Sequence, residues 1–187
     1  ADDFNEALHS LIRETIKKHK RIIFNGNGYD ESWIQEAEKR GLLNLKTTPD
    51  CMPYIVAEKN VKMLVSHGVF TEPELHSRCE IMLDNYVKSV NIEACTMISM
   101  ARKQIIPAVG KFAADTAKQI SEKCAVCGNI KCSCEKKLVE KLSSLIDAMD
   151  EKTEVLEKAV ASLHEISDVI AQSEYVRDHI LEAMDDL

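Results

Sequence analysis

The chain has few residues that interrupt helices. Only six of its 187 residues are glycine and four are proline, whereas a β-sandwich of this size would need many more turn residues. Leu, Ala, Glu, Lys and Met, which favour helices, are abundant instead. The composition therefore predicts an all-α protein built as a helical bundle.

Long apolar runs are also lacking. No stretch approaches the roughly 20 uninterrupted apolar residues that cross a bilayer, and the N-terminal sequence ADDFNEALHS lacks the basic and apolar regions of a signal peptide. Seven cysteines, an odd number, indicate reduced thiols. We therefore expect no membrane partner and a cytoplasmic location. Because residue 1 is Ala and a helical pattern starts almost at once, we also expect a segment of a longer protein.

A basic surface is absent too. The formal net charge is −7, and no predicted helix carries a stripe of Lys and Arg. Most of the surface would repel a phosphate backbone. We therefore expect no nucleic-acid partner.

The strongest local helix signal begins the second third of the chain. Thr71 and Glu74 are spaced as a capping box, and apolar residues then occur on nearly every face up to residue 123. This pattern predicts a long central helix over 71–123 that several neighbours cover. Pro107 removes one backbone hydrogen bond, so we expect a kink near Gly110.

A second long helix is predicted to return along the first. Its apolar ladder has a 3,4 spacing, and such a narrow seam indicates antiparallel packing on one partner, the 71–123 helix. The ladder consists of Leu138, Leu142, Leu145, Met149, Lys152, Leu156, Ala159, Leu163, Ile166 and Ile170, in which Lys152 is the polar interruption.

The predicted organisation is a single helical domain over 1–187. Short helices and loops of residues 1–70 pack on the base of a long antiparallel hairpin, and helices of residues 135–187 return along it. Within 1–70, Asp30 is expected to cap one short helix that ends at Gly41, and Asp50 another that places Pro53 in its first turn and ends at Gly68.

Four cysteines lie where the hairpin must reverse, in a Cys-rich tip over 124–134. Cys124 and Cys127 form a C-x-x-C pair, and Cys132 and Cys134 follow within seven residues. Zinc takes four thiolates at the corners of a tetrahedron, and four protein ligands leave no open position for a substrate. We therefore consider a structural zinc ion at the tip, with a solvated loop of free thiols as the alternative. Cys51, Cys79 and Cys95 are expected to pack in the core.

No other pattern predicts catalysis or a cofactor. The turn Phe24-Asn-Gly-Asn-Gly-Tyr29 lacks the Lys-Ser/Thr of a phosphate-binding loop, so we expect a tight turn whose glycines take positive φ. The six histidines are scattered singly. We assign no catalytic and no cofactor-binding residue.

Several blocks of the sequence are too specific to be generic helix formers. They are HKRIIFNGNGY at 19–29, Trp33, EAEKRGL at 36–42, EKNVK at 58–62, HGVFT at 67–71, LHSR at 75–78 and NIEA at 91–94. These blocks resemble the C-terminal part of type III glutamine synthetases. The likeness extends from the first helix to Pro107 and continues more loosely through residues 165–168.

The resemblance implies an enzyme that makes glutamine from glutamate, ammonia and ATP at a divalent-metal site, with Mg or Mn, in stacked hexameric rings. It also implies that the catalytic motifs belong to an upstream β-rich region, so no catalytic residue can be transferred to this chain, and the isolated segment is expected to be inactive. A scaffold, subunit-contact or regulatory role would follow, with the remainder of the polypeptide and neighbouring subunits as partners. The alternative is a free-standing, zinc-stapled helical interaction module.

Overall fold

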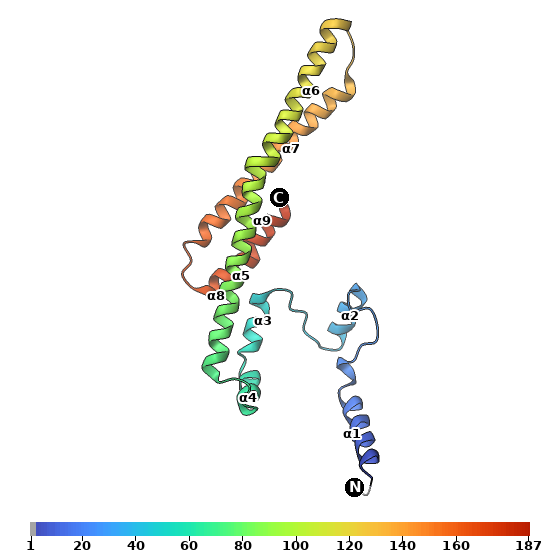
Figure 1. Ribbon diagram of the computed structural model, residues 1–187, viewed down its shortest axis with the longest axis vertical. Helices are drawn as coiled ribbons and strands as arrows, with labels where there is room; N and C mark the ends of the chain where they lie inside the picture. The colour runs from blue at the N-terminus through green and yellow to red at the C-terminus, as the bar shows by residue number, and fades with distance from the viewer. Residues whose placement is uncertain (1–2) are drawn as a thin grey trace. The chain divides into compact units, whose positions relative to one another are not determined.

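A computed structural model describes residues 3–187, and all regular structure in this range is helical (Figure 1). The predicted all-α class is confirmed. The chain divides into two compact units, residues 1–46 and 47–187. None of the described helices is long and apolar enough to cross a lipid bilayer. The prediction of a single domain over 1–187 stays a prediction.

The first unit starts with an amphipathic helix, α1 (Phe4–Lys18), which Asp3 caps by accepting a hydrogen bond of 2.8 Å from the Asn5 N–H. Lys17 and Lys18 lie in its last turn, where positive charge suits the helix dipole. No side chain of α1 is buried in the described structure. Its apolar face is therefore not covered by the other residues of this unit.

A 3₁₀ turn (Lys20–Ile22) and a loop connect α1 to α2 (Glu31–Lys39), which Asp30 caps as predicted. The rings of Phe24 and Trp33 stack at a centroid distance of 4.1 Å. Arg40 donates a 2.7 Å hydrogen bond to the Ile23 carbonyl, which ties the end of α2 back to the loop.

The glycines of this loop differ from the prediction. Among the described glycines, positive φ occurs at Gly41, Gly68 and Gly128, and not at Gly26 or Gly28. Gly26 is needed for another reason, because an added Cβ would lie 2.5 Å from the ring of Phe24. Close approach of the aromatic ring, and not backbone conformation, requires glycine at position 26.

The second unit begins with two short helices, α3 (Thr48–Ile55) and α4 (Glu58–Ser66), in place of the one helix predicted. Pro49, and not Pro53, occupies the first turn of α3, and Pro53 lies inside the helix. Asp50 is consequently not the N-cap; its carboxylate instead accepts a 2.6 Å hydrogen bond from the Thr47 hydroxyl. The predicted end at Gly68 is confirmed by its φ of 65°.

The long central helix is confirmed, and it is continuous for 56 residues. It comprises α5 (Glu72–Met100), a π-helical turn (Ala101–Ile105) and α6 (Ile106–Cys127), and the Thr71–Glu74 capping box starts it. The π turn ends two residues before Pro107. We attribute it to the missing N–H and the ring of this proline, which prevent ordinary α-helical bonding to the preceding turn.

The next helix, α7 (Ser133–Leu163), runs back along α6 and then along the end of α5 (Figure 1). The predicted antiparallel hairpin is therefore present. At its base the chain forms α8 (Val169–Tyr175), a second π turn (Val176–Ile180) and α9 (Leu181–Asp186). A cluster of buried apolar side chains from α5, α7 and the C-terminal helices forms the main core: Val87, Val90, Ala94, Leu156, Val160, Leu163, Val176, Ile180 and Ala183.

From Leu138 to Leu163, the predicted ladder is correct at every seventh residue and one residue early at the alternate positions. The prediction is wrong for Ile166 and Ile170, because α7 ends at Leu163 and Ile170 is 54% exposed. Leu156 is fully buried, but Leu145 is 54% exposed. Lys152 is exposed and Thr153 lies in the seam, where its hydroxyl donates a 2.7 Å hydrogen bond to the Met149 carbonyl. The seam is Val139, Leu142, Ile146, Met149, Thr153, Leu156, Val160 and Leu163.

Candidate functional site at the cysteine-rich hairpin tip

The hairpin reverses within five residues at its outer end. Cys124 and Cys127 lie in the last turn of α6, and Gly128, with φ of 66°, ends that helix. Cys132 takes a left-handed conformation, with φ of 44°, directly before α7 begins, and Cys134 lies in the first turn of α7. The four predicted ligands therefore come from two helix ends and the loop that joins them.

Two of the four thiols are in contact. The Cys124 and Cys132 thiols lie close enough to interact. Cys132 is buried and Cys124 half-buried, whereas Cys127 and Cys134 are exposed. In the described part of the chain, no three His, Cys, Asp or Glu side chains are arranged to hold a metal ion. The zinc site at these four cysteines thus stays a prediction.

An ion pair closes the tip beside the thiols. The ammonium of Lys123, on α6, lies 2.9 Å from a carboxylate oxygen of Glu135, on α7. This hydrogen bond lowers the pKa of Glu135 and raises that of Lys123. Burial, together with the nearby Cys124 and Glu135, raises the pKa of the Cys132 thiol. Without a metal, Cys132 therefore favours its protonated form.

The other cysteines follow the predicted core packing only in part. Cys79 is half-buried and lines an apolar cavity of about 190 Å³ together with Met52 and Leu83, and burial raises its pKa. Cys51 is also half-buried, but Cys95 is exposed. Core packing is therefore wrong for Cys95.

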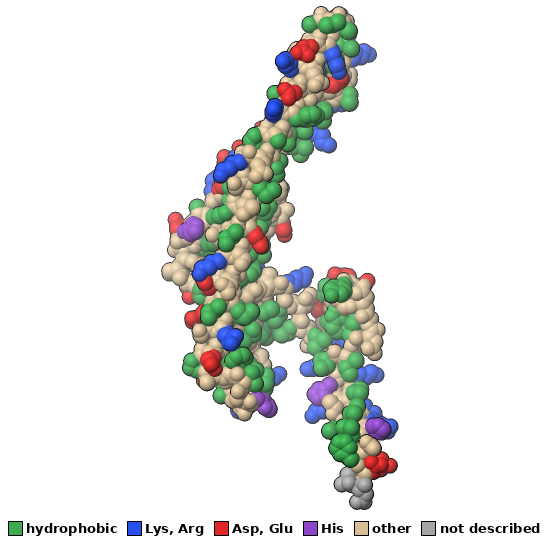
Figure 2. Space-filling model, in the orientation of Figure 1, with side chains coloured by type: hydrophobic (Ala, Val, Ile, Leu, Met, Phe, Trp, Pro, Cys, Tyr) green, Lys and Arg blue, Asp and Glu red, His purple; other side chains and the backbone are tan. Residues whose placement is uncertain are grey.

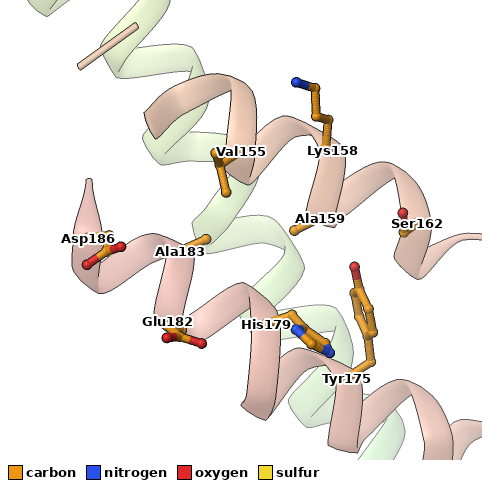
Figure 3. Close-up of a pocket in the computed structure, with 9 residues that line it drawn as sticks. All are labelled: Val155, Lys158, Ala159, Ser162, Tyr175, His179, Glu182, Ala183 and Asp186. Carbon is orange, nitrogen blue, oxygen red and sulfur yellow. The ribbon is translucent and has the colours of Figure 1, made fainter. Parts of the chain in front are cut away.

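A groove of about 400 Å³ lies between α7 and the C-terminal helices (Figure 3). Lys158 and Ser162 come from α7, while Tyr175, His179 and Glu182 come from the opposite wall. The rings of Tyr175 and His179 lie 4.6 Å apart, centroid to centroid. No nucleophile in this groove is held by a neighbouring base in the described contacts, and the groove offers mixed polar and apolar walls with no assembled catalytic group.

Two arginine–carboxylate clusters were not predicted. The arginine of each cluster lies in a π turn. Arg102 binds Glu157 through two hydrogen bonds of 3.0 and 2.9 Å and also binds Asp150. This interaction lowers the pKa of Glu157. The two carboxylates lie 48 and 55 residues from the arginine, so no local sequence pattern could have revealed the cluster.

The second cluster joins the C-terminal helices to α3. Arg177 binds Asp178 at 2.6 Å and Asp50 at 2.9 Å. The hydroxyl of Tyr86 is buried close to these charges and has no hydrogen-bond partner within the described residues. Burial raises its pKa. These contacts fix helices together and present no open site.

Comparison with known proteins places the chain in a family. Residues 7–124 match the family model described as the glutamine synthetase C-terminal domain. A glutamine synthetase of Butyrivibrio fibrisolvens is 34% identical over 193 aligned residues, which cover all of this chain and 27% of that relative. The chain belongs to the glutamine synthetase C-terminal domain family.

A second relative supports the type III resemblance. The type-3 glutamine synthetase of Dictyostelium discoideum is 37% identical over 102 residues, covering 54% of this chain and 14% of that relative. A glutamine synthetase of Bacteroides fragilis is 33% identical over 103 residues, which cover 55% of this chain and 14% of that relative. The resemblance predicted from the sequence blocks is confirmed. This C-terminal domain spans about a quarter of the length of the relative that matches all of it.

The family match ends at Cys124. The rest of the tip and all of α7 therefore lie beyond the matched range of this glutamine synthetase C-terminal domain. The family gives no support to a metal at the tip, and the case for zinc depends on the cysteines themselves.

Proposed function

We propose that this chain is the C-terminal helical part of a cytoplasmic type III glutamine synthetase, in which it acts as a non-catalytic scaffold. In that enzyme, glutamate, ammonia and ATP would form glutamine at a divalent-metal site, with Mg or Mn, carried by the remainder of the polypeptide. The chain would attach to that remainder through the apolar face of α1. The family membership and the uncovered face of α1 support this proposal.

The face of α1 is the observation that carries the docking role. Phe4 is 76% exposed, Leu11 62% and Ile16 51%, and Leu8 and Ile12 are exposed beside them. Figure 2 shows hydrophobic side chains along this helix. Soluble proteins rarely expose a contiguous apolar surface of this kind unless it is an interaction site.

The relatives indicate what covers this face. The B. fibrisolvens protein matches the whole chain but is almost four times as long, so most of its polypeptide is available as a covering surface. We therefore assign the remainder of the same polypeptide, from its own or a neighbouring subunit of a homo-oligomer, as the occupant.

The scaffold role also agrees with the contacts of the carboxylates on α7. ATP-dependent ligation needs carboxylate-held metal ions and groups that bind phosphate. Asp150 and Glu157, which come together on α7, are both bound by Arg102. We therefore expect the purified chain to form no γ-glutamyl hydroxamate above a no-protein blank, and turnover would contradict the scaffold role.

The docking face is tested in the full-length protein. Leu11→Asp should weaken attachment of this segment, because it places a charge in a buried apolar contact, and should raise hydrogen exchange in α1 at least tenfold. Ser10→Asp, on the polar side of the same helix, is the matched control. Equal exchange in the wild-type protein and in Leu11→Asp would overturn the docking role.

Two further measurements separate the alternatives. Cross-links from α1 in a mixture of isotope-labelled and unlabelled full-length protein distinguish a subunit's own catalytic part from that of its neighbour. A natural reading frame that encodes only this chain would instead favour the free-standing interaction module.

A further inference from the structure

We propose that the hairpin tip is a structural zinc site, in which Cys124, Cys127, Cys132 and Cys134 bind one Zn²⁺ as thiolates. This proposal is independent of the scaffold function, because it concerns residues that mostly lie beyond the family match.

The helix ends already organise half of the site. Cys124 and Cys127 are three residues apart in the last turn of α6, so both side chains project from one side of that helix. The loop returns Cys132 beside Cys124, and the 2.9 Å ion pair between Lys123 and Glu135 closes the tip next to Cys124 and Cys134. A thiol from the helix end and a thiol from the loop are therefore brought together before any metal binds.

The remaining two ligands need only local movement. Cys127 and Cys134 are exposed, and each lies within three residues of a thiol of the contacting pair. A cysteine sulfur is placed by a single side-chain torsion with three staggered positions. No three thiols converge in the described structure as it stands, so zinc would complete the site as it binds, as metal binding commonly does when it is coupled to folding.

The charge around the tip suits four thiolates. Zinc with four thiolates carries a net charge of about −2. Residues 122–137 contain four lysines and two glutamates, although the whole chain has a net charge of −7. This local positive charge stabilises the thiolates that binding creates when the thiols release their protons.

Elemental analysis of the 187-residue chain tests the site. We expect close to one equivalent of zinc in protein purified under reducing conditions from zinc-supplemented medium. Cys→Ser at 124, 127, 132 or 134 should lower this to below about 0.2 equivalents. Cys95→Ser is the matched control, because Cys95 is an exposed cysteine of α5, and it should retain the full equivalent.

A second measurement does not depend on variants that might misfold. Co²⁺ added to the metal-free wild-type chain should give the intense visible bands of tetrahedral thiolate coordination at one equivalent. Metal-free wild-type protein that also gives no such bands would overturn the proposal. So would a full equivalent of zinc in Cys127→Ser and Cys134→Ser, or a Cys124–Cys132 disulfide, two hydrogens lighter, in protein that takes up no metal.

Discussion

Each of the two arginine clusters depends on one residue in a π turn. Arg102 and Arg177 occupy the second position of their turns, directly after Ala101 and Val176, which are buried. A π turn inserts one extra residue into the helical spacing. The extra residue lets the apolar neighbour face the core while the guanidinium reaches carboxylates on another helix.

Arg102→Gln should lower the thermal unfolding midpoint by a few degrees at pH 7, because Glu157 and Asp150 lose their partner. The hydrogen bond from Arg102 holds the pKa of Glu157 below its ordinary value of 4.5. The contribution of the Arg102–Glu157 pair to stability is therefore present above about pH 4.5. It is lost as the pH falls through the lower pKa that Glu157 has in the folded state.

The difference in midpoint between wild type and Arg102→Gln should consequently shrink in acid. Thermal unfolding at a series of pH values between 7 and 3 measures it. Lys103→Gln, which changes an exposed charge in the same π turn, is the control. A difference that stays constant down to pH 3 would show that Arg102 acts through packing alone.

Tyr86→Phe should stabilise the protein. The Tyr86 hydroxyl is buried without a hydrogen-bond partner in the described structure, and an unsatisfied buried polar group costs about 1–3 kcal/mol. Removing it should raise the free energy of unfolding by about 1 kcal/mol, measured by urea denaturation. Tyr29→Phe, at a fully exposed side chain, should change nothing. A comparable loss of stability in Tyr86→Phe would contradict the assignment.

Among the elements, α7 provides the clearest stability test. Leu156→Ala should lower the free energy of unfolding by about 2–5 kcal/mol, because Leu156 is fully buried and the truncation leaves a cavity. Leu145→Ala is the matched control: its side chain is 54% exposed, so the cost should be about 1 kcal/mol or less. Urea denaturation measures both, and equal costs would contradict the seam described here.

The error in the α7 ladder shows how far apolar spacing specifies an interface. Spacing of 3 then 4 and spacing of 4 then 3 share every seventh position, so Leu142, Met149 and Leu156 were predicted correctly. At the alternate positions 138, 145 and 159 the apolar residue has an apolar neighbour, as at Leu145 and Ile146. Apolar spacing therefore fits both phases there, and Lys152 was the one residue in the sequence that disfavoured the predicted phase.

Helix ends were predicted best where side chains act locally. The Thr71–Glu74 capping box and the glycine at position 68 are complete within a few residues, so the sequence contains the whole interaction. The start of α3 was misplaced, because the proline of a first turn could be either Pro49 or Pro53. The break between α3 and α4 was missed, because no glycine or proline marks it: residues 56 and 57 are Val and Ala. The same contrast between local and long-range interactions holds for the cysteine-rich tip and the arginine clusters. The four cysteines are close in sequence and could be recognised, whereas the arginine clusters join distant residues.

At the scale of the whole molecule, the two units should differ in stability. Among the described residues, Ala37 is the buried apolar residue of unit 1–46, and the others belong to unit 47–187. A 15-residue helix with no buried side chain is marginal in water. We therefore expect residues 47–187 alone to unfold cooperatively and residues 1–46 alone to show little helical circular dichroism.

This comparison also tests the predicted single domain. If residues 1–46 belong to one cooperative domain with the rest, removing them should lower the unfolding midpoint of residues 47–187. An unchanged midpoint would establish two independent units. Loss of cooperative unfolding in residues 47–187 would contradict the expectation that this unit contains its own core.

The outer part of the α6–α7 hairpin should unfold progressively from its tip. Beyond the core, Figure 1 shows α6 and α7 covered only by each other, and α6 alone extends for about 33 Å at 1.5 Å per residue. Each turn there is held by its neighbours alone, so fraying begins at the tip and each further turn opened costs additional free energy. A ligand that binds the tip would therefore slow hydrogen exchange along all of the outer α6–α7 hairpin. A ligand that binds beside α9 would leave hydrogen exchange in the outer turns unchanged.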